Sequence, residues 1–166
     1  MSTRALRIGF VGTYPPTACG IATFTASLRD AVVKGGHGVT ADVIRVLTSR
    51  PDESNPPEVV ATWDTSSPAA LSEAAQVASD LDCIVLQHEF GIYGAADGEQ
   101  VADFVEGCPT PVVTVLHTVV PDPTPRQRDI VQRLLDASVV TVVQTHAARD
   151  RLRARHAVDD EALVVI

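Results

Sequence analysis

Two hydrophobic patterns alternate along this chain. Short runs of consecutive apolar residues are typical of strands buried on both faces, and apolar residues spaced three or four apart are typical of amphipathic helices. The first pattern predicts strands at 6–11, 39–47, 58–63, 83–87, 111–116, 139–143 and 163–166. The second predicts helices at 21–34 and 98–106 and further helices beginning at Pro68, at Pro125 and after Thr145.

This alternation of strands and helices predicts the fold class. About seven strands separated by helices indicate an α/β fold with a doubly wound, mostly parallel, Rossmann-like sheet. The length of 166 residues suits a single domain, 1–166, with a substantial core. Because the sequence stops within or directly after a predicted strand, we expect the native chain to continue past Ile166.

The first predicted strand leads into the first helix through a loop at 13–20. Gly20 stands at the start of the helix, where unpaired backbone N–H groups and the helix dipole suit a phosphate, a carboxylate or a polarised hydroxyl. The loop contains neither G-x-G-x-x-G nor the Walker A pattern. An ordinary strand-to-helix turn is therefore the alternative. Cys19 is a candidate thiolate nucleophile by position, but no neighbouring His or Asp pattern supports it.

Polar residues follow several of the predicted strands. In an open parallel sheet, ligands bind outside the carboxyl ends of the strands. The segments at those ends are 13–20, 87–94, 117–118 and 144–146, and they contain three of the five histidines. A histidine at a strand end is often structural, but three at one rim beside Glu89 favour a functional site. A zinc site formed by His88, His117 and Cys19 is an alternative, although their spacing matches no recognised zinc motif.

Composition and charge narrow the class of protein. Hydrophobic residues make up 45% and charged residues 20%, as in a globular chain, and the net charge of −8 argues against a nucleic-acid partner. No apolar run approaches the length of a membrane span and no signal-peptide pattern opens the chain, so a cytoplasmic location is expected. Four arginines at 149–155 indicate a solvated helix face, or a patch for peripheral contact with an anionic membrane surface.

Four segments carry a resemblance to a known family. They are T-Y-P-P-T-A-C-G-I-A-T-F at 13–24, Q-H-E-F-G-I-Y-G at 87–94, and V-V-T-V-L-H-T at 112–118, followed by V-V-T-V-V-Q-T-H at 139–146. In this order they resemble the N-terminal half of a group 1 (family 4) retaining glycosyltransferase of the two-domain GT-B fold. The resemblance covers nearly the whole chain. Cys19 stands where the family's loop often has the first of two glycines.

The resemblance implies a role for the chain and for its residues. In the family, the N-terminal domain holds mainly the acceptor, and the C-terminal domain holds a UDP- or GDP-linked sugar without need of a metal. By position, Gly20, Cys19 and Thr17 would meet the donor phosphate or sugar, and His117 would be the catalytic residue beside the reacting sugar. The acceptor side would be lined by His88, Glu89, Phe90, Tyr93 and Thr118.

The resemblance also implies a missing partner. The family's basic residues and its E-x7-E element belong to the C-terminal nucleotide-sugar domain, which this sequence lacks. We therefore expect the isolated chain to be inactive and, because of its apolar last strand, prone to self-association. The alternatives are a stand-alone module that binds a sugar or nucleotide without catalysis, and half of a GT-B type sugar-nucleotide epimerase.

Overall fold

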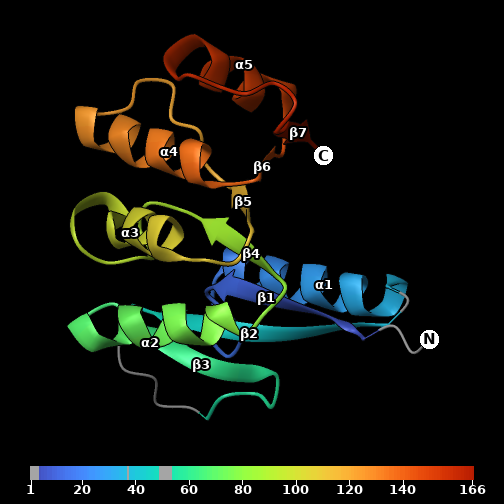
Figure 1. Ribbon diagram of the computed structural model, residues 1–166. Helices are drawn as coiled ribbons and strands as arrows, with labels where there is room; N and C mark the ends of the chain where they lie inside the picture. Colours follow the sequence, from blue (N-terminus) through green and yellow to red (C-terminus); the bar gives the residue numbers. More distant parts are fainter. Residues whose placement is uncertain (1–3, 37, 49–53) are drawn as a thin grey trace.

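A computed structural model describes residues 4–36, 38–48 and 54–166 of the chain. Its strands form one seven-stranded sheet in the order β3-β2-β1-β4-β5-β6-β7, and every pairing is parallel (Figure 1). The strands are β1 (Leu6–Gly12), β2 (Val39–Leu47), β3 (Val59–Asp64), β4 (Cys83–His88), β5 (Val112–Leu116), β6 (Val140–Val143) and β7 (Leu163–Val165). The predicted α/β, Rossmann-like fold is confirmed.

The helices lie on both sides of the sheet. They are α1 (Gly20–Gly35), α2 (Pro68–Ser79), α3 (Gln100–Gly107), α4 (Pro125–Ala137) and α5 (His146–Arg155), with a short 3₁₀ turn, η1 (Ala96–Gly98). Helix α1 packs on one face with a small apolar cluster, whereas α2, α3 and α4 line the other (Figure 1). Right-handed crossover connections require this arrangement. The connection from β1 to β2 crosses the sheet in one direction, whereas the connections from β4 to β7 cross it in the opposite direction.

Most predicted boundaries lie within one residue of those in the structure, and the start of one helix differs by two for a clear reason. The helix expected at 98–106 begins as a 3₁₀ turn and becomes α-helical only at Gln100. Asp97 and Gly98 both have positive φ, which interrupts the helix there. A Cβ at position 98 would lie 2.6 Å from the backbone oxygen of Phe90, so only glycine fits this approach. Strand β4 also extends one residue further than predicted and includes His88.

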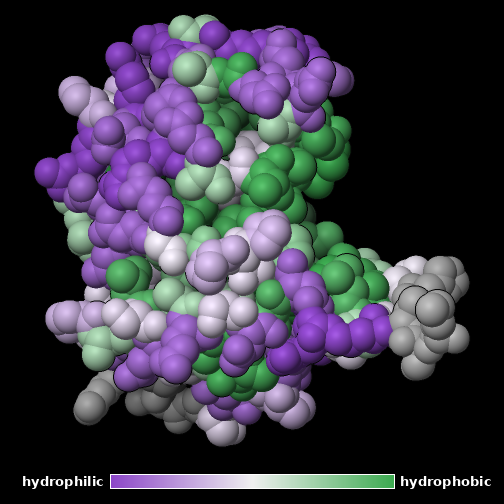
Figure 2. Space-filling model, viewed as in Figure 1, coloured by the Kyte–Doolittle hydropathy of each residue, from purple (hydrophilic) through white to green (hydrophobic). Residues whose placement is uncertain are grey.

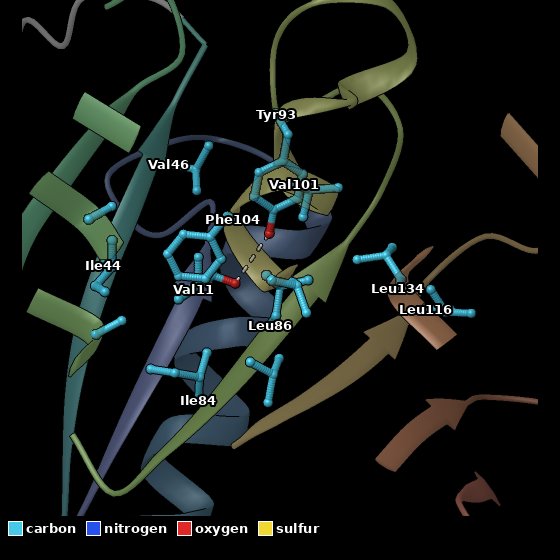
Figure 3. Packing of buried hydrophobic residues seen from close by; sticks show 14 of the residues in the cluster. Val11, Ile44, Val46, Ile84, Leu86, Tyr93, Val101, Phe104, Leu116 and Leu134 are labelled. Carbon is cyan, nitrogen blue, oxygen red and sulfur yellow. Dashed lines mark hydrogen bonds between the residues drawn. The ribbon is translucent and has the colours of Figure 1, made fainter. Parts of the chain in front are cut away.

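The main core lies between the sheet and helices α2 to α5. Trp63 is fully buried, with its ring centroid 5.3 Å from that of Tyr93 and 5.1 Å from that of Phe104. The Tyr93 hydroxyl donates to the carbonyl oxygen of Gln87 at 2.6 Å. It also lies 3.4 Å from the carbonyl oxygen of Val11, the contact that the dashed line marks in Figure 3. These carbonyls stand near the carboxyl ends of the adjacent strands β4 and β1. The tyrosine therefore joins the two central strands just below their rim.

The β6–β7 end of the sheet carries exposed apolar residues. Val139, Val164 and Ile166, at β6 and β7, are 54%, 41% and 66% exposed. Figure 2 shows apolar surface on the side of β6 and β7 that faces away from the largely polar surface of α3 and α4. Parallel strands are ordinarily covered on both faces. The self-association expected from this strand stays a prediction.

Replacing Tyr93 with Phe tests the tie between β1 and β4. The variant keeps the ring in the core but leaves the Gln87 carbonyl without its hydroxyl donor, so the free energy of unfolding should fall by about 1–3 kcal/mol. Urea denaturation followed by tryptophan fluorescence measures this. Tyr14→Phe is the matched control, since the Tyr14 hydroxyl donates to Glu58, which can turn to water. An equal loss in both variants would contradict the proposed tie.

Candidate functional site

The candidate site lies at the carboxyl ends of β1, β4, β5 and β6. Their parallel direction places the segments that follow them along one rim of the sheet. His117 directly follows β5, and its backbone N–H donates to the carbonyl of His88 at the end of β4 at 3.1 Å. The strand pairing thus continues to the rim and sets where the His117 side chain begins.

Two glutamines hold the His117 ring. Gln87 Oε1 lies 2.8 Å from Nε2, and Gln144 Nε2 lies 3.1 Å from Nδ1. The Phe24 ring of α1 stands at 90° to the imidazole, with its centroid 4.9 Å away. Partial burial lowers the His117 pKa below its ordinary value, against an opposing effect of Glu89. The ring is therefore neutral at neutral pH, with one N–H and one acceptor nitrogen.

Glu89 and Thr118, both predicted to line the acceptor side, lie in contact with each other. The Thr118 hydroxyl donates to Glu89 Oε2, and the backbone N–H of Phe90 donates to Oε1 at 3.0 Å. Phe90 is half-buried, with its ring edge-on to His88 at 4.8 Å. This arrangement fixes the Glu89 carboxylate between the segments that follow β4 and β5.

The start of helix α1 is capped by a thiol. Cys19 Sγ accepts from the backbone N–H of Ala22 at 3.3 Å and lies 3.2 Å from the Thr13 hydroxyl. Cys19 therefore takes the N-cap position that Ser, Thr or Asp usually fills. Gly20 is exposed, and the described residues outside its own turn leave the place of a Cβ free, so the start of α1 lies at the surface.

Thr17 is oriented by a buried arginine. Arg45, in β2, is 3% exposed, and its guanidinium donates to the Thr17 hydroxyl at 2.8 Å and to Asn55 Oδ1 at 2.9 Å. Sequence reasoning assigned Arg45 no role. The feature that could have pointed to it is a single cationic residue within the apolar run V-I-R-V-L at 43–47. A buried charge of this kind needs partners, and here they belong to two loops at the rim.

His88 and Tyr93 lie beneath the rim. Both are fully buried in this conformation, so neither side chain offers surface to a ligand. Their expected contact with an acceptor stays a prediction. Within the described part of the chain, neither ring nitrogen of His88 has a hydrogen-bond partner. Burial lowers the His88 pKa to about 3. The inclusion of His88 in β4 directs it into the core.

The arrangement gives no support to a zinc site. His117 uses both ring nitrogens with glutamines, and the Cys19 sulfur caps α1. Among the described residues, no group of three or more His, Cys, Asp or Glu side chains is arranged to hold a metal. Within the same part of the chain, no helix has the length and apolar character needed to cross a membrane.

The arginines of α5 form local contacts. Arg149, Arg153 and Arg155 pair with Asp150, Asp160 and Asp122. Arg151 donates to the carbonyl of Val119 at 3.2 Å. Peripheral contact with a membrane stays a prediction.

A cleft of about 370 Å³ opens beside His117, between the segment after β5 and the start of α5. It is lined by Leu116, His117, Thr118, Val119, Val120, Pro121, Gln144, Thr145, Ala148 and Arg151. Gln144 is exposed and stands between this cleft and the imidazole Nδ1. Sequence reasoning gave no role to Gln144, Gln87 or Phe24. Their positions in the sequence could have pointed to the two glutamines. Gln87 directly precedes His88, and Gln144 directly follows the predicted strand at 139–143.

Comparisons with known proteins point to one kind of fold. No family model and no curated protein matches the chain. An alpha-glucosyltransferase solved in complex with UDP and a 13-mer DNA containing a central A:G mismatch is 15% identical, with a TM-score of 0.59, over 97% of this chain. An alpha-glucosyltransferase in complex with UDP is 16% identical, with a TM-score of 0.53, over 85%.

The chain has a GT-B glycosyltransferase-like fold. It spans 40% and 35% of the lengths of those two proteins. At such low identity the likeness concerns the fold alone. The narrower family 4 and the retaining stereochemistry stay predictions.

Burial of His88 predicts acid sensitivity. The unfolded chain binds a proton at this imidazole near pH 6.5, whereas the folded chain does so only near pH 3. Stability associated with neutral His88 is therefore complete above pH 6.5 and is lost as pH falls toward 3. His117 and His156, whose pKa values are also lowered by burial, act in the same direction.

His88→Leu should therefore flatten the fall of the unfolding free energy between pH 6.5 and 3 by a few kcal/mol relative to the unsubstituted chain. Urea denaturation at a series of pH values measures the difference. Replacement of the exposed His146 with Leu is the matched control. Parallel pH profiles for the unsubstituted chain and His88→Leu would contradict the prediction.

Proposed function

We propose that this chain is the acceptor-side part of a glycosyltransferase that moves a hexose from a UDP- or GDP-linked sugar to a small-molecule acceptor. The observation that carries the proposal is the neutral, doubly hydrogen-bonded His117 on the same rim as the exposed start of α1 at Gly20. The fold of UDP-bound alpha-glucosyltransferases supports it. A second, nucleotide-sugar-binding domain is part of the proposal.

The α1 side of the rim suits the donor. Cys19 takes the N–H of Ala22, which leaves the N–H groups of Gly20 and Ile21 in the first turn to meet a phosphate or a sugar hydroxyl. The helix dipole favours negative charge there. Thr17 is held by Arg45, so its hydroxyl has a fixed position beside this turn. The developing negative charge on a leaving nucleoside diphosphate is stabilised electrostatically, with no metal in the proposal.

The Glu89 side of the rim suits the acceptor. A sugar or polyol offers hydroxyl donors, and the Glu89 carboxylate, with Thr118 beside it, offers acceptors in a fixed position. Phe90 adds a half-buried ring on which an apolar sugar face can pack. We do not include nucleic acid among the proposed partners, because the net charge of −8 disfavours its binding. One of the similar structures does contain DNA.

His117→Ala tests the proposed catalytic role. In the native polypeptide that contains this chain, it should lower the rate of transfer about 10²-fold or more, because a positioned imidazole acts on the reacting sugar. Release of UDP or GDP from a panel of nucleotide-sugars measures the rate. The matched control is His146→Ala, at the exposed start of α5. Unchanged transfer would refute the role, and a change in binding without any turnover would favour the non-catalytic binding module.

The 166-residue chain alone should show no sugar transfer and weak or absent nucleotide-sugar binding. The reason is that the proposed second domain would make most of the contacts with the donor. Ligand-observed NMR with UDP-glucose and GDP-mannose, together with the nucleotide-release assay, checks this. The intact mass of the native protein shows whether a longer polypeptide exists to restore activity. Measurable turnover by the isolated chain would contradict the proposal that a second domain binds the donor.

A further inference from the structure

The two nitrogens of His117 differ in what a ligand can reach. Nε2 faces Gln87, whose side chain is 0% exposed, at 2.8 Å. Nδ1 faces Gln144, which is exposed and lines the cleft beside α5. A buried amide packed beneath α1 cannot leave, whereas an exposed one can turn away into water. Nδ1 is therefore the nitrogen that a ligand can reach.

The hydrogen bonds also decide which nitrogen carries the proton. In a neutral imidazole one nitrogen donates and the other accepts. The carbonyl oxygen of the Gln87 amide faces Nε2, and an oxygen there requires an N–H on the ring. The Gln144 amide nitrogen faces Nδ1 and donates to it, which requires a lone pair at that position. Both contacts agree on the tautomer with hydrogen on Nε2.

Gln87 is the buried residue that holds the His117 ring, and it is itself held by the core. Its backbone carbonyl accepts from the Tyr93 hydroxyl, which fixes the strand end from within the core. Its amide nitrogen has no hydrogen-bond partner among the described residues, so its only polar side-chain contact is with His117. The side chain is thus placed for the imidazole and for nothing else.

We propose that Gln87 is a positioning residue that holds His117 with its proton on Nε2, so that Nδ1 accepts a hydrogen bond from a ligand hydroxyl that replaces Gln144. This rests on the proposed function for the identity of the ligand, an alcohol of a sugar or polyol. It assigns the cleft between β5 and α5 as the place from which that hydroxyl approaches. His117 then acts as an acceptor toward the ligand, and not as a donor.

The groups around the imidazole are compatible with this state. Glu89 favours the charged form, while burial opposes it, and His88 lies behind β4 as a neutral ring. Arg151 lines the same cleft and donates to the Val119 carbonyl. From α1 the ring meets Phe24, which carries no charge.

Long-range ¹H–¹⁵N spectra of the histidine rings in the 166-residue chain test the tautomer without any substrate. We expect the Nε2–H form of His117 in the unsubstituted chain and in Gln144→Ala, and a mixture of both forms in Gln87→Met. Gln87→Glu should raise the titration midpoint of His117 by about one pH unit or more, because a carboxylate replaces a neutral acceptor. Gln76→Glu, at an exposed position of α2, is the charge-matched control.

A small-molecule probe tests the acceptor role of Nδ1. Glycerol, which donates hydroxyl hydrogens, should shift the Nδ1 resonance, and more so in Gln144→Ala, whereas 1,2-dimethoxyethane, which cannot donate, should not. An Nδ1–H tautomer, a tautomer lost in Gln144→Ala but kept in Gln87→Met, or an equal response to both probes would overturn the inference. Failure of sugar transfer with the expected spectra would instead count against the proposed function alone.

Discussion

The hydrogen bond from the Tyr93 hydroxyl to the Gln87 carbonyl joins the core of this protein to its rim. It lies where β1 and β4, the two central strands, approach their carboxyl ends. Tyr93 is packed against Trp63, so the position of Gln87 depends on the largest rings of the core. The Gln87 amide in turn fixes His117. A change in core packing is thereby transmitted to the imidazole through one residue.

The rim combines fixed and movable elements. Arg45 holds Thr17 from beneath, Cys19 caps α1, and Thr118 holds Glu89, so that these polar groups have positions set before a ligand arrives. Gln144 is exposed and can move. Preorganised groups lower the ordering cost of binding, and a movable amide allows one hydrogen bond to be exchanged for another. This division is compatible with the polyhydroxylated ligand that we propose for the site.

Much of the fold could be predicted because its causes are local. The apolar run at 83–87 can be buried only as a covered strand, and the Thr124–Gln127 capping box starts α4 where expected. The start of α3 could not be predicted, because Gly98 adopts positive φ to pass the carbonyl of Phe90, which precedes it in the connection between β4 and α3. This close approach depends on how that connection folds back on itself. The end of β4 was misplaced for a similar reason, since His88 is retained in the strand by its pairing with Leu116.

The sequence by itself determined the order of strands and helices, their parallel direction and hence the rim at which His117, Glu89, Thr118 and Gly20 meet, because periodicity and crossover handedness are properties of the chain. Only the tertiary structure decided which neighbours each side chain has. It placed His88 and Tyr93 beneath the rim, and it brought Gln87, Gln144 and Arg45 into the site. The physical reason is that hydrogen bonds between residues 27, 28 or 30 positions apart depend on strand register and packing, which no local pattern records.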